Sequence, residues 1–222
     1  NNISNTDKSL FKTSMGYDFE DLRKKTIEWL KTNELIVLPF KAGGNDYGYD
    51  SLLIAPANAG FFAAGLYDLQ GYLDIKDLDE NFSPKAIIYL APPFRHSHFK
   101  GKQAVVHNCN NEIHEIFSYN MYPGPSAKKG VYGVLLSIGV KEGWITAHGS
   151  TVKVATPYDN EIVFLHEGAS GSGKSEMLEG AHRSPDGRLK LGKNIINGDR
   201  KYFSLGQSCK LYPVTDDMAL CH

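Results

Sequence analysis

Apolar residues along the chain form short runs that Gly, Pro and Asn separate, with one longer stretch of helical periodicity. Residues 18–34 form that stretch, because their apolar side chains recur near one helical face, and Asp18 is placed to cap its start. The short runs have the length and composition of buried strands. Predicted strands occupy residues 35–40, 52–55, 85–90, 103–107, 145–154 and 161–166, the last two joined by a turn at 157–160.

The remaining segments carry weaker patterns. Residues 1–17 are polar and aperiodic, which predicts a loose arm. Polar residues 79–84 and the basic, His-containing residues 94–102 predict loops. Residues 128–144 are ambiguous, because their apolar spacing fits a helix while a strand is also compatible. Helical and strand patterns in one chain predict an α/β fold.

The composition is that of an ordinary globular protein, with 41% hydrophobic and 22% charged residues. Lys plus Arg number 24 against 25 Asp plus Glu, so the chain lacks the basic excess of nucleic-acid-binding proteins. No apolar run reaches the roughly 18 residues that a membrane-spanning helix needs. The 3 cysteines form no CxxC pair, which favours reduced thiols and a cytoplasmic location. The chain begins without Met and ends soon after an acidic pair, so we expect a fragment of a longer protein.

Residues 168–175 read Gly-Ala-Ser-Gly-Ser-Gly-Lys-Ser and match the phosphate-binding pattern G-x-x-x-x-G-K-[ST] at every fixed position. An apolar run, 162–165, precedes them, and residues 175–179 can begin a helix. Glycines let backbone N–H groups turn toward a phosphate, and the helix start adds partial positive charge. Lys174 is predicted to neutralise phosphate charge, and Ser175 to ligate Mg²⁺. The motif predicts a nucleotide site formed by Gly168, Ser170, Gly171, Ser172, Gly173, Lys174 and Ser175.

An acidic partner of this motif should end a neighbouring strand. The apolar stretch that starts at Lys210 closes with Asp216 and Asp217, which we predict to hold a divalent metal or to supply a base. Pro213 argues against a central strand. Asp199 is a rival, although a surface role is favoured for it.

The segments around this motif resemble two families that share a nucleotide-binding core, the ATP-dependent phosphoenolpyruvate carboxykinases and the HPr kinase/phosphorylases. Residues 122–134 are similar to the carboxykinase segment Y-A-G-x-x-K-K-G, with one extra residue, and residues 147–152 to H-x-S-A-N-V. The form G-K-S-E at 173–176 is nearer the kinases, and residues 211–217 resemble the acidic strand L-I-G-D-D of both families. The resemblance covers residues 122–217.

The helix and strand pattern predicts a mixed α/β domain at residues 18–121. The resemblance implies that it is followed by the start of a carboxykinase-like P-loop nucleotide-binding region at 122–222. It implies divalent-metal-dependent phosphoryl transfer from ATP, with a small carboxylate such as oxaloacetate as the substrate. Lys128 would then be a catalytic group, with Lys174 and Asp216, and would face the carboxylate or phosphate of the substrate.

The same resemblance implies a second metal site. Lys129, His148 and Asp217 would be its Mn²⁺ ligands, beside the Mg²⁺ held through Ser175 and Asp216. A lysine ligates metal only when neutral, so burial and the metal charge would have to lower its pKa. We therefore expect this site to be partly buried. Tyr122 would line the substrate pocket.

The chain also departs from the carboxykinase pattern. An insertion at about 183–207 separates Lys174 from the acid pair, and the substrate-binding motif R-S-P-x-D has no match before residue 122. Two alternatives therefore remain open. One is a kinase that acts on a protein hydroxyl, favoured by Ser175–Glu176, and the other is a non-catalytic nucleotide-binding regulator. The spacing of the His and Cys residues between 96 and 114 fits no zinc-ligand pattern.

Overall fold

The computed structural model describes residues 10–78, 80–109, 112–169, 171–175, 188–204, 209–216 and 218–221. The chain divides into two compact units, a first unit of residues 1–135 and a second unit of residues 136–222. This division falls inside a helix. The domain boundary expected between residues 121 and 122 rests on the motif resemblance and stays a prediction.

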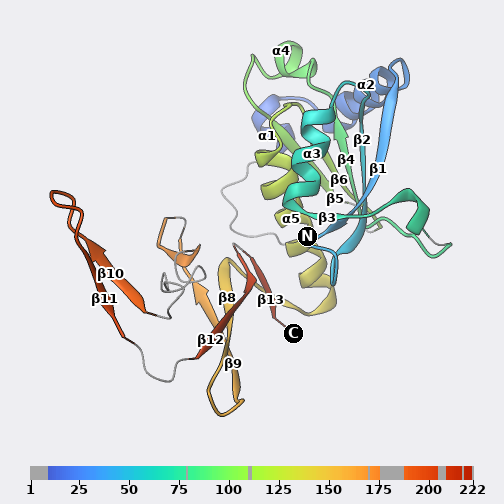
Figure 1. Cartoon of the computed structure of the whole chain (residues 1–222). Coiled ribbons are helices and arrows are strands. Elements are labelled where there is room, and N and C mark those ends of the chain that lie inside the picture. Colours follow the sequence, from blue (N-terminus) through green and yellow to red (C-terminus); the bar gives the residue numbers. More distant parts are fainter. Residues whose placement is uncertain are drawn as a thin grey trace. The chain divides into compact units, whose positions relative to one another are not determined.

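The first unit is built on a six-stranded mixed sheet with the order β3-β1-β2-β4-β6-β5 (Figure 1). The inner strands β2, β4 and β6 run parallel to one another, and β1, β3 and β5 pair antiparallel with their neighbours. Parallel neighbours require crossover connections, which helices supply here. The predicted α/β class is confirmed. The strands are β1 (Leu35–Ala42), β2 (Tyr49–Pro56), β3 (Gly71–Tyr72), β4 (Ala86–Leu90), β5 (Val105–Cys109) and β6 (His114–Ser118).

Helices cover both faces of this sheet, with α2 on one face and α3 and α5 on the other (Figure 1). Two consecutive residues of β6 show the two sides. The Phe117 ring lies 5.0 Å from the Phe19 ring of α2, whereas the Ile116 side chain lies 3.4 Å from where a Cβ on Gly130 of α5 would stand. Successive strand residues point to opposite faces, and helices cover both faces. Every residue of β6 is therefore buried. The helices are α1 (Phe11–Met15), α2 (Phe19–Lys31), α3 (Gly60–Leu69), α4 (Phe94–His98) and α5 (Lys129–Glu142), with a 3₁₀ turn at Ile75–Asp77 and a π-helical turn at Gly124–Lys128.

An aromatic cluster joins α2 to the sheet. Leu22, Phe117 and Tyr119 are buried at its centre, with several partly buried aromatic rings packed around them. The Thr26 hydroxyl donates to the Leu22 carbonyl at 2.8 Å, so the Tyr119 hydroxyl, 3.0 Å from Thr26, is the donor in their contact. Burial raises the pKa of Tyr119 above its ordinary value, which keeps this hydroxyl protonated as a donor.

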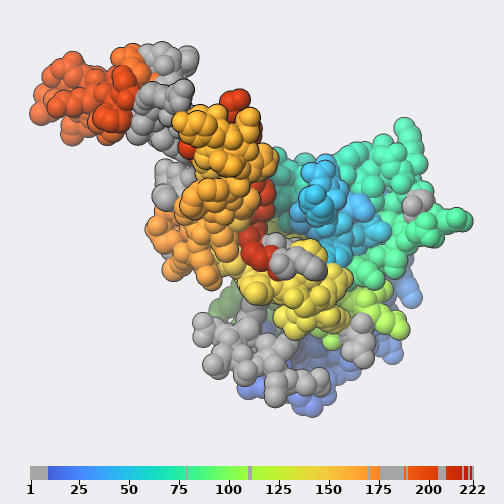
Figure 2. All heavy atoms as spheres, turned by 90° about the horizontal axis from the view of Figure 1, so that it is seen from below, coloured from blue at the N-terminus to red at the C-terminus, as the bar shows by residue number. Residues whose placement is uncertain are grey.

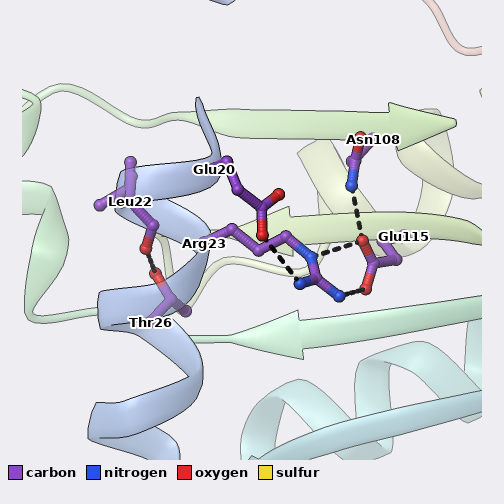
Figure 3. Close-up of polar contacts among 6 residues, drawn as sticks. All are labelled: Glu20, Leu22, Arg23, Thr26, Asn108 and Glu115. Atoms are coloured by element: carbon purple, nitrogen blue, oxygen red, sulfur yellow. Dashed lines mark hydrogen bonds and ion pairs between the residues drawn. The ribbon is translucent and has the colours of Figure 1, made fainter. Parts of the chain in front are cut away.

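A buried ion pair also joins α2 to β6 (Figure 3). Arg23 donates from Nε and Nη2 to the two carboxylate oxygens of Glu115, at 2.9 and 2.7 Å. Asn108 of β5 adds a third bond at 2.7 Å, while Glu20 contacts Arg23 from the exposed side at 3.3 Å. Only 6% of the Glu115 side chain is exposed. The bidentate contact satisfies both oxygens, which is what allows a carboxylate in a fully buried strand.

The second unit is built from antiparallel strands. Within the described residues β8 lies between β12 and β9, β13 pairs with β7, and β10 pairs with β11. The strand predicted at 161–166 is confirmed as β9, whereas the single strand predicted at 145–154 is wrong, because the chain breaks at His148 into β7 and β8, which belong to different sheets. Pro213 lies in β12, an edge strand of its sheet, where a missing N–H is tolerated. The strands are β7 (Ile145–Ala147), β8 (Gly149–Ala155), β9 (Glu161–Glu167), β10 (Leu189–Lys193), β11 (Arg200–Phe203), β12 (Lys210–Thr215) and β13 (Ala219–Cys221).

The structure corrects the expectation of a loose arm for the part of residues 1–17 that it describes. Residues 11–15 form α1, and the Phe11 ring packs against the rings of Tyr17 and Phe19 at 5.3 and 5.1 Å. Asp18 stands at the N-cap position of α2, but its side chain makes no capping hydrogen bond and instead pairs with Lys12 at 3.0 Å. The predicted role of Asp18 as a cap is therefore wrong.

Four further elements differ from the sequence-based predictions or complete them. The helix α3 was not predicted, because Gly60–Leu69 is so apolar that it lacks a polar face. The strand β6 was not predicted, because the sequence of His114–Ser118 is too polar to indicate burial. Part of the expected loop at 94–102 forms the short helix α4, and the ambiguous segment at 128–144 forms α5.

Candidate functional site

The motif residues 168–175, called the glycine loop below, directly follow β9 in the second unit. Gly171 and Gly173 have φ of +80° and +90°, the left-handed region that favours glycine. The N–H of Gly168 donates to the His148 carbonyl at 3.4 Å, and a Cβ on Gly168 would stand 2.6 Å from Ser172 Oγ. The positive φ values of Gly171 and Gly173, and the lack of room for a Cβ at Gly168, explain why glycine recurs in this loop. Lys174 and Ser175 are helical, so the helix predicted at residues 175–179 begins where expected. Its continuation from residue 176, and the position of Ser170, lie outside the described residues.

Lys174 lies against the backbone of the glycine loop. Its Nζ donates to the Ala169 carbonyl at 3.1 Å, and only 9% of the residue is exposed. The N–H of Ser172 donates to the same carbonyl at 3.1 Å. One carbonyl therefore holds the ammonium group close to the turn of the loop, where an anion bound by the loop amides would meet it.

Ser175 contacts the predicted acid. Its hydroxyl donates to Asp216 Oδ1 at 2.8 Å, across 41 positions of sequence. Asp216 directly follows β12, whose Thr215 pairs with Thr151 of β8. The prediction that Asp216 lies beside Ser175 is confirmed, while its role as a metal ligand or base stays a prediction. Asp217 lies outside the described residues.

The rival acid, Asp199, belongs to the turn between β10 and β11. The Asp199 N–H donates to Asn197 Oδ1 at 3.0 Å, and the Asp199 carboxylate accepts from Asn197 Nδ2 at 2.8 Å. The Asn194 N–H donates to the Asp199 carbonyl at 2.7 Å. Asp199 is thus a hairpin-turn residue, in agreement with the surface role favoured for it.

The residues predicted to contact substrate lie in the first unit. Tyr122 is 58% exposed, with its ring packed against Gly124, and Lys128 is exposed at the end of the π-helical turn. Lys129, the first residue of α5, is also exposed, which is not the partly buried position expected for a lysine that ligates metal. His148, in the second unit, is half-buried between β7 and β8. The predicted convergence of Lys129, His148 and Asp217 stays a prediction.

A histidine pair that the sequence analysis did not predict lies between β5 and β6. His107 Nδ1 and His114 Nε2 are 2.8 Å apart, and Cys109 Sγ lies 3.3 Å from His114 Nε2. Among the described residues, no group of three or more His, Cys, Asp or Glu side chains is arranged to hold a metal ion. The pairing of the two strands explains the contact, because Cys109 and His114 stand opposite each other.

The glycine loop and Asp216 suit a phosphorylated ligand with its cation. Lys174 and the loop amides are cationic and polar donors, which suit phosphate oxygens. The Ser175 hydroxyl and the Asp216 carboxylate are oxygen ligands that stand next to each other, which suits Mg²⁺ as a hard cation. The residues present therefore fit a magnesium–nucleotide complex.

Comparison with known proteins places the whole chain in one family. A family model described as "Domain of unknown function (DUF4914)" matches residues 2–222. No curated protein matches the chain. In the described ranges, no helix combines the length and the apolar character needed to cross a membrane.

Proposed function

The chain belongs to the DUF4914 family, and we propose that it binds ATP with Mg²⁺ at the glycine loop and transfers a phosphoryl group to an acceptor. One observation carries the proposal. The Ser175 hydroxyl and the Asp216 carboxylate, from separate segments, meet at 2.8 Å directly after a loop that holds Lys174. Phosphoryl transfer depends mainly on positioning and on charge compensation, which these groups would supply.

Binding would replace a weak partner of Lys174 with a stronger one. In the structure the ammonium group is bonded to the neutral Ala169 carbonyl. A β- or γ-phosphate oxygen is anionic, and charge-assisted hydrogen bonds are roughly twice as strong as neutral ones. Since Lys174 is 9% exposed, little solvent screening would weaken that contact.

The acceptor is proposed from the carboxykinase resemblance of residues 122–217. A small carboxylate would contact Lys128 and Tyr122, and Mn²⁺ held by Lys129, His148 and Asp217 would stabilise charge on it. This arrangement requires Lys129, which is exposed, to lose solvent when the ligands bind. A regulator that binds nucleotide without turnover is the second candidate, and the exposed Lys129 favours it. A cytoplasmic location is part of the same proposal.

Replacing Lys174 tests nucleotide binding. We expect Lys174→Ala to weaken ATP–Mg²⁺ binding about tenfold to a hundredfold, because hydrogen bonds to charged groups contribute about 1.5–3 kcal/mol. Isothermal titration calorimetry on the full chain measures the affinity. Lys190→Ala is the matched control, since Lys190 is an exposed lysine of β10 in the same unit.

Equal affinities of the wild-type protein and Lys174→Ala would overturn the proposal, provided that circular dichroism shows both to be folded. Turnover assays then separate the acceptors. ATP consumption with oxaloacetate supports the carboxykinase-like reaction, and labelling of a protein hydroxyl supports the kinase alternative. Tight ATP binding without turnover supports the regulator.

A further inference from the structure

Three pairs of consecutive residues are linked around Ser175 and Asp216. Ser150 and Thr151 stand in β8, the middle strand between β12 and β9, and both are buried, at 0% and 7% exposure. Each belongs to a different hydrogen bond. Three hydrogen bonds join the pairs Ser150–Thr151, Lys174–Ser175 and Thr215–Asp216 into a closed ring, which is called the β8 ring below.

The first bond of the β8 ring fixes the glycine loop. The Ser150 hydroxyl donates to the Lys174 carbonyl at 2.8 Å. That carbonyl shares a rigid peptide plane with the N–H of Ser175. Ser150 therefore sets the direction of the Ser175 N–H and limits where the Ser175 side chain can stand.

The second bond fixes the acid. Thr151 Oγ1 and Thr215 Oγ1 are 2.8 Å apart, at the point where the pairing of β12 with β8 shifts register after Pro213. A register shift normally loosens a strand end. The hydroxyl contact holds this strand end in place, and Asp216 is the next residue.

The third bond, from Ser175 to Asp216 Oδ1, is also 2.8 Å long and closes the ring. Three short bonds between three covalently joined pairs leave few ways to move one pair without the others. The short side chains of Ser and Thr have few rotamers, so holding them costs little entropy. The bonds at Lys174 and Thr215 therefore act together on the position of the Ser175 and Asp216 side chains.

We propose that Ser150 and Thr151 are positioning residues that set the geometry of the Ser175–Asp216 pair for a divalent cation. This inference rests on the proposed function, because the cation is the one that accompanies ATP. Neither hydroxyl is proposed as a ligand of phosphate or metal. They act through the Lys174 carbonyl and through Thr215.

Thr151→Val tests the inference, because valine keeps the shape of threonine and removes only the hydroxyl. The measurement is the gain in ATP affinity that Mg²⁺ gives, taken by calorimetry with Mg²⁺ and with EDTA. We expect this gain to fall about threefold to tenfold, as the loss of one buried hydrogen bond gives. Ser150→Ala should reduce it similarly, and Thr151→Ser, which keeps the hydroxyl, should restore most of it.

Ser118→Ala is the matched control. Ser118 is also buried, and its hydroxyl bonds to the Asn120 carbonyl and lies near Ser126 Oγ at 3.1 and 3.0 Å, within the first unit. We expect this variant to lose thermal stability without changing the Mg²⁺-dependent gain. An unchanged gain in both Thr151→Val and Ser150→Ala would overturn the inference.

A second measurement does not require nucleotide. In ¹⁵N–¹H spectra of the full chain, Thr151→Val should shift the amide signal of Ser175, and Ser150→Ala that of Asp216, through the ring. Undisturbed signals at these two residues would refute the β8 ring even in a protein that binds no ATP. If the signals shift but the wild-type protein binds no ATP, the β8 ring is supported and the proposed function is refuted. If Thr151→Val does not fold, the comparison of Ser150→Ala with wild type decides both measurements.

Discussion

At the scale of single residues, the buried carboxylate of Glu115 shows how one contact fixes a segment. His114 and Glu115 are consecutive residues of β6, and both are buried, at 7% and 4% exposure of the whole residue. Arg23 lies 92 positions away in sequence and meets both oxygens of Glu115. Without that partner a buried carboxylate is strongly unfavourable. The ion pair therefore makes a polar segment compatible with the middle of a sheet.

Arg23→Met should lower the free energy of unfolding by about 3 kcal/mol, because it leaves Glu115 buried without its cation. This value lies at the low end for buried pairs, since the Arg23 side chain is 32% exposed. In the double variant Arg23→Met, Glu115→Leu we expect much of the loss to be recovered. Urea unfolding of the two single variants and the double variant gives the coupling energy, about 1–3 kcal/mol.

Glu20→Gln is the control for this cycle, because Glu20 contacts the same arginine from an exposed position. It should change the free energy of unfolding by less than about 0.5 kcal/mol. Strictly additive losses in the Arg23 and Glu115 variants would show that the pair does not stabilise the contact between α2 and β6.

At the scale of elements, α4 packs against α2 through aromatic and charged side chains. The Phe94 ring lies 6.0 Å from the Trp29 ring and 5.2 Å from the His98 ring. His98 and Lys25 line one cavity of about 280 Å³ with Tyr17. Burial, and secondly the charge of Lys25, lower the pKa of His98 below its ordinary value. Protonation of this histidine therefore opposes the packing of the two helices.

His98 should make the protein less stable in mild acid. Its folded-state pKa is lower than the unfolded value of 6.5, so its contribution is fully present above pH 6.5 and is lost as the pH falls through the folded pKa. We expect His98→Gln to lose less stability than wild type between about pH 7 and pH 5. Urea midpoints across that range measure the effect.

His96→Gln is the matched control, since His96 is an exposed residue of the same helix. Its midpoints should follow the wild-type pH profile. If the profile of His98→Gln also follows that of wild type, the lowered pKa of His98 does not influence the contact between α4 and α2.

At the scale of the whole molecule, the largest exposed apolar segment among the described residues is β9. Four consecutive residues, Ile162 to Leu165, are 49%, 60%, 47% and 42% exposed, so both faces of the strand are open. The β8–β9 hairpin, gold to orange in Figure 2, lies at the molecular surface in that view. In the described part of the chain β9 also has β8 as its one strand neighbour. An apolar strand with a free edge favours association between molecules.

Val163→Lys should reduce concentration-dependent self-association of the chain. A charge on an exposed edge strand disfavours pairing with another strand. Sedimentation velocity over a range of protein concentrations measures the effect. Val140→Lys adds the same charge at a residue of α5 that is 78% exposed, and should leave self-association unchanged. Equal behaviour of the two variants would show that net charge, and not the edge of β9, controls association.

Local patterns in the sequence determined the α/β class, the helix at 18–34 and most of the strands. They also identified the glycine loop, because its glycine and lysine spacing is fixed by the shape of a phosphate. The apolar stretch before Asp216, together with the resemblance of residues 211–217 to the acidic strand of the two families, selected Asp216 rather than Asp199. These features depend on residues that are close together in the sequence, so local residue patterns are enough to predict them.

Only the tertiary structure decided the contacts between residues that are far apart in the sequence. The burial of β6 depends on Arg23, and the β8 ring depends on hydroxyls that stand opposite each other only after β12 pairs with β8. A serine or threonine in a strand has no sequence signal for its partner, because that partner is set by register and by residues far along the chain. Helix α3 likewise shows no amphipathic period in its sequence. The sequence therefore contained the glycine and lysine pattern of the loop, and only folding decided which side chains contact Lys174, Ser175 and Thr215.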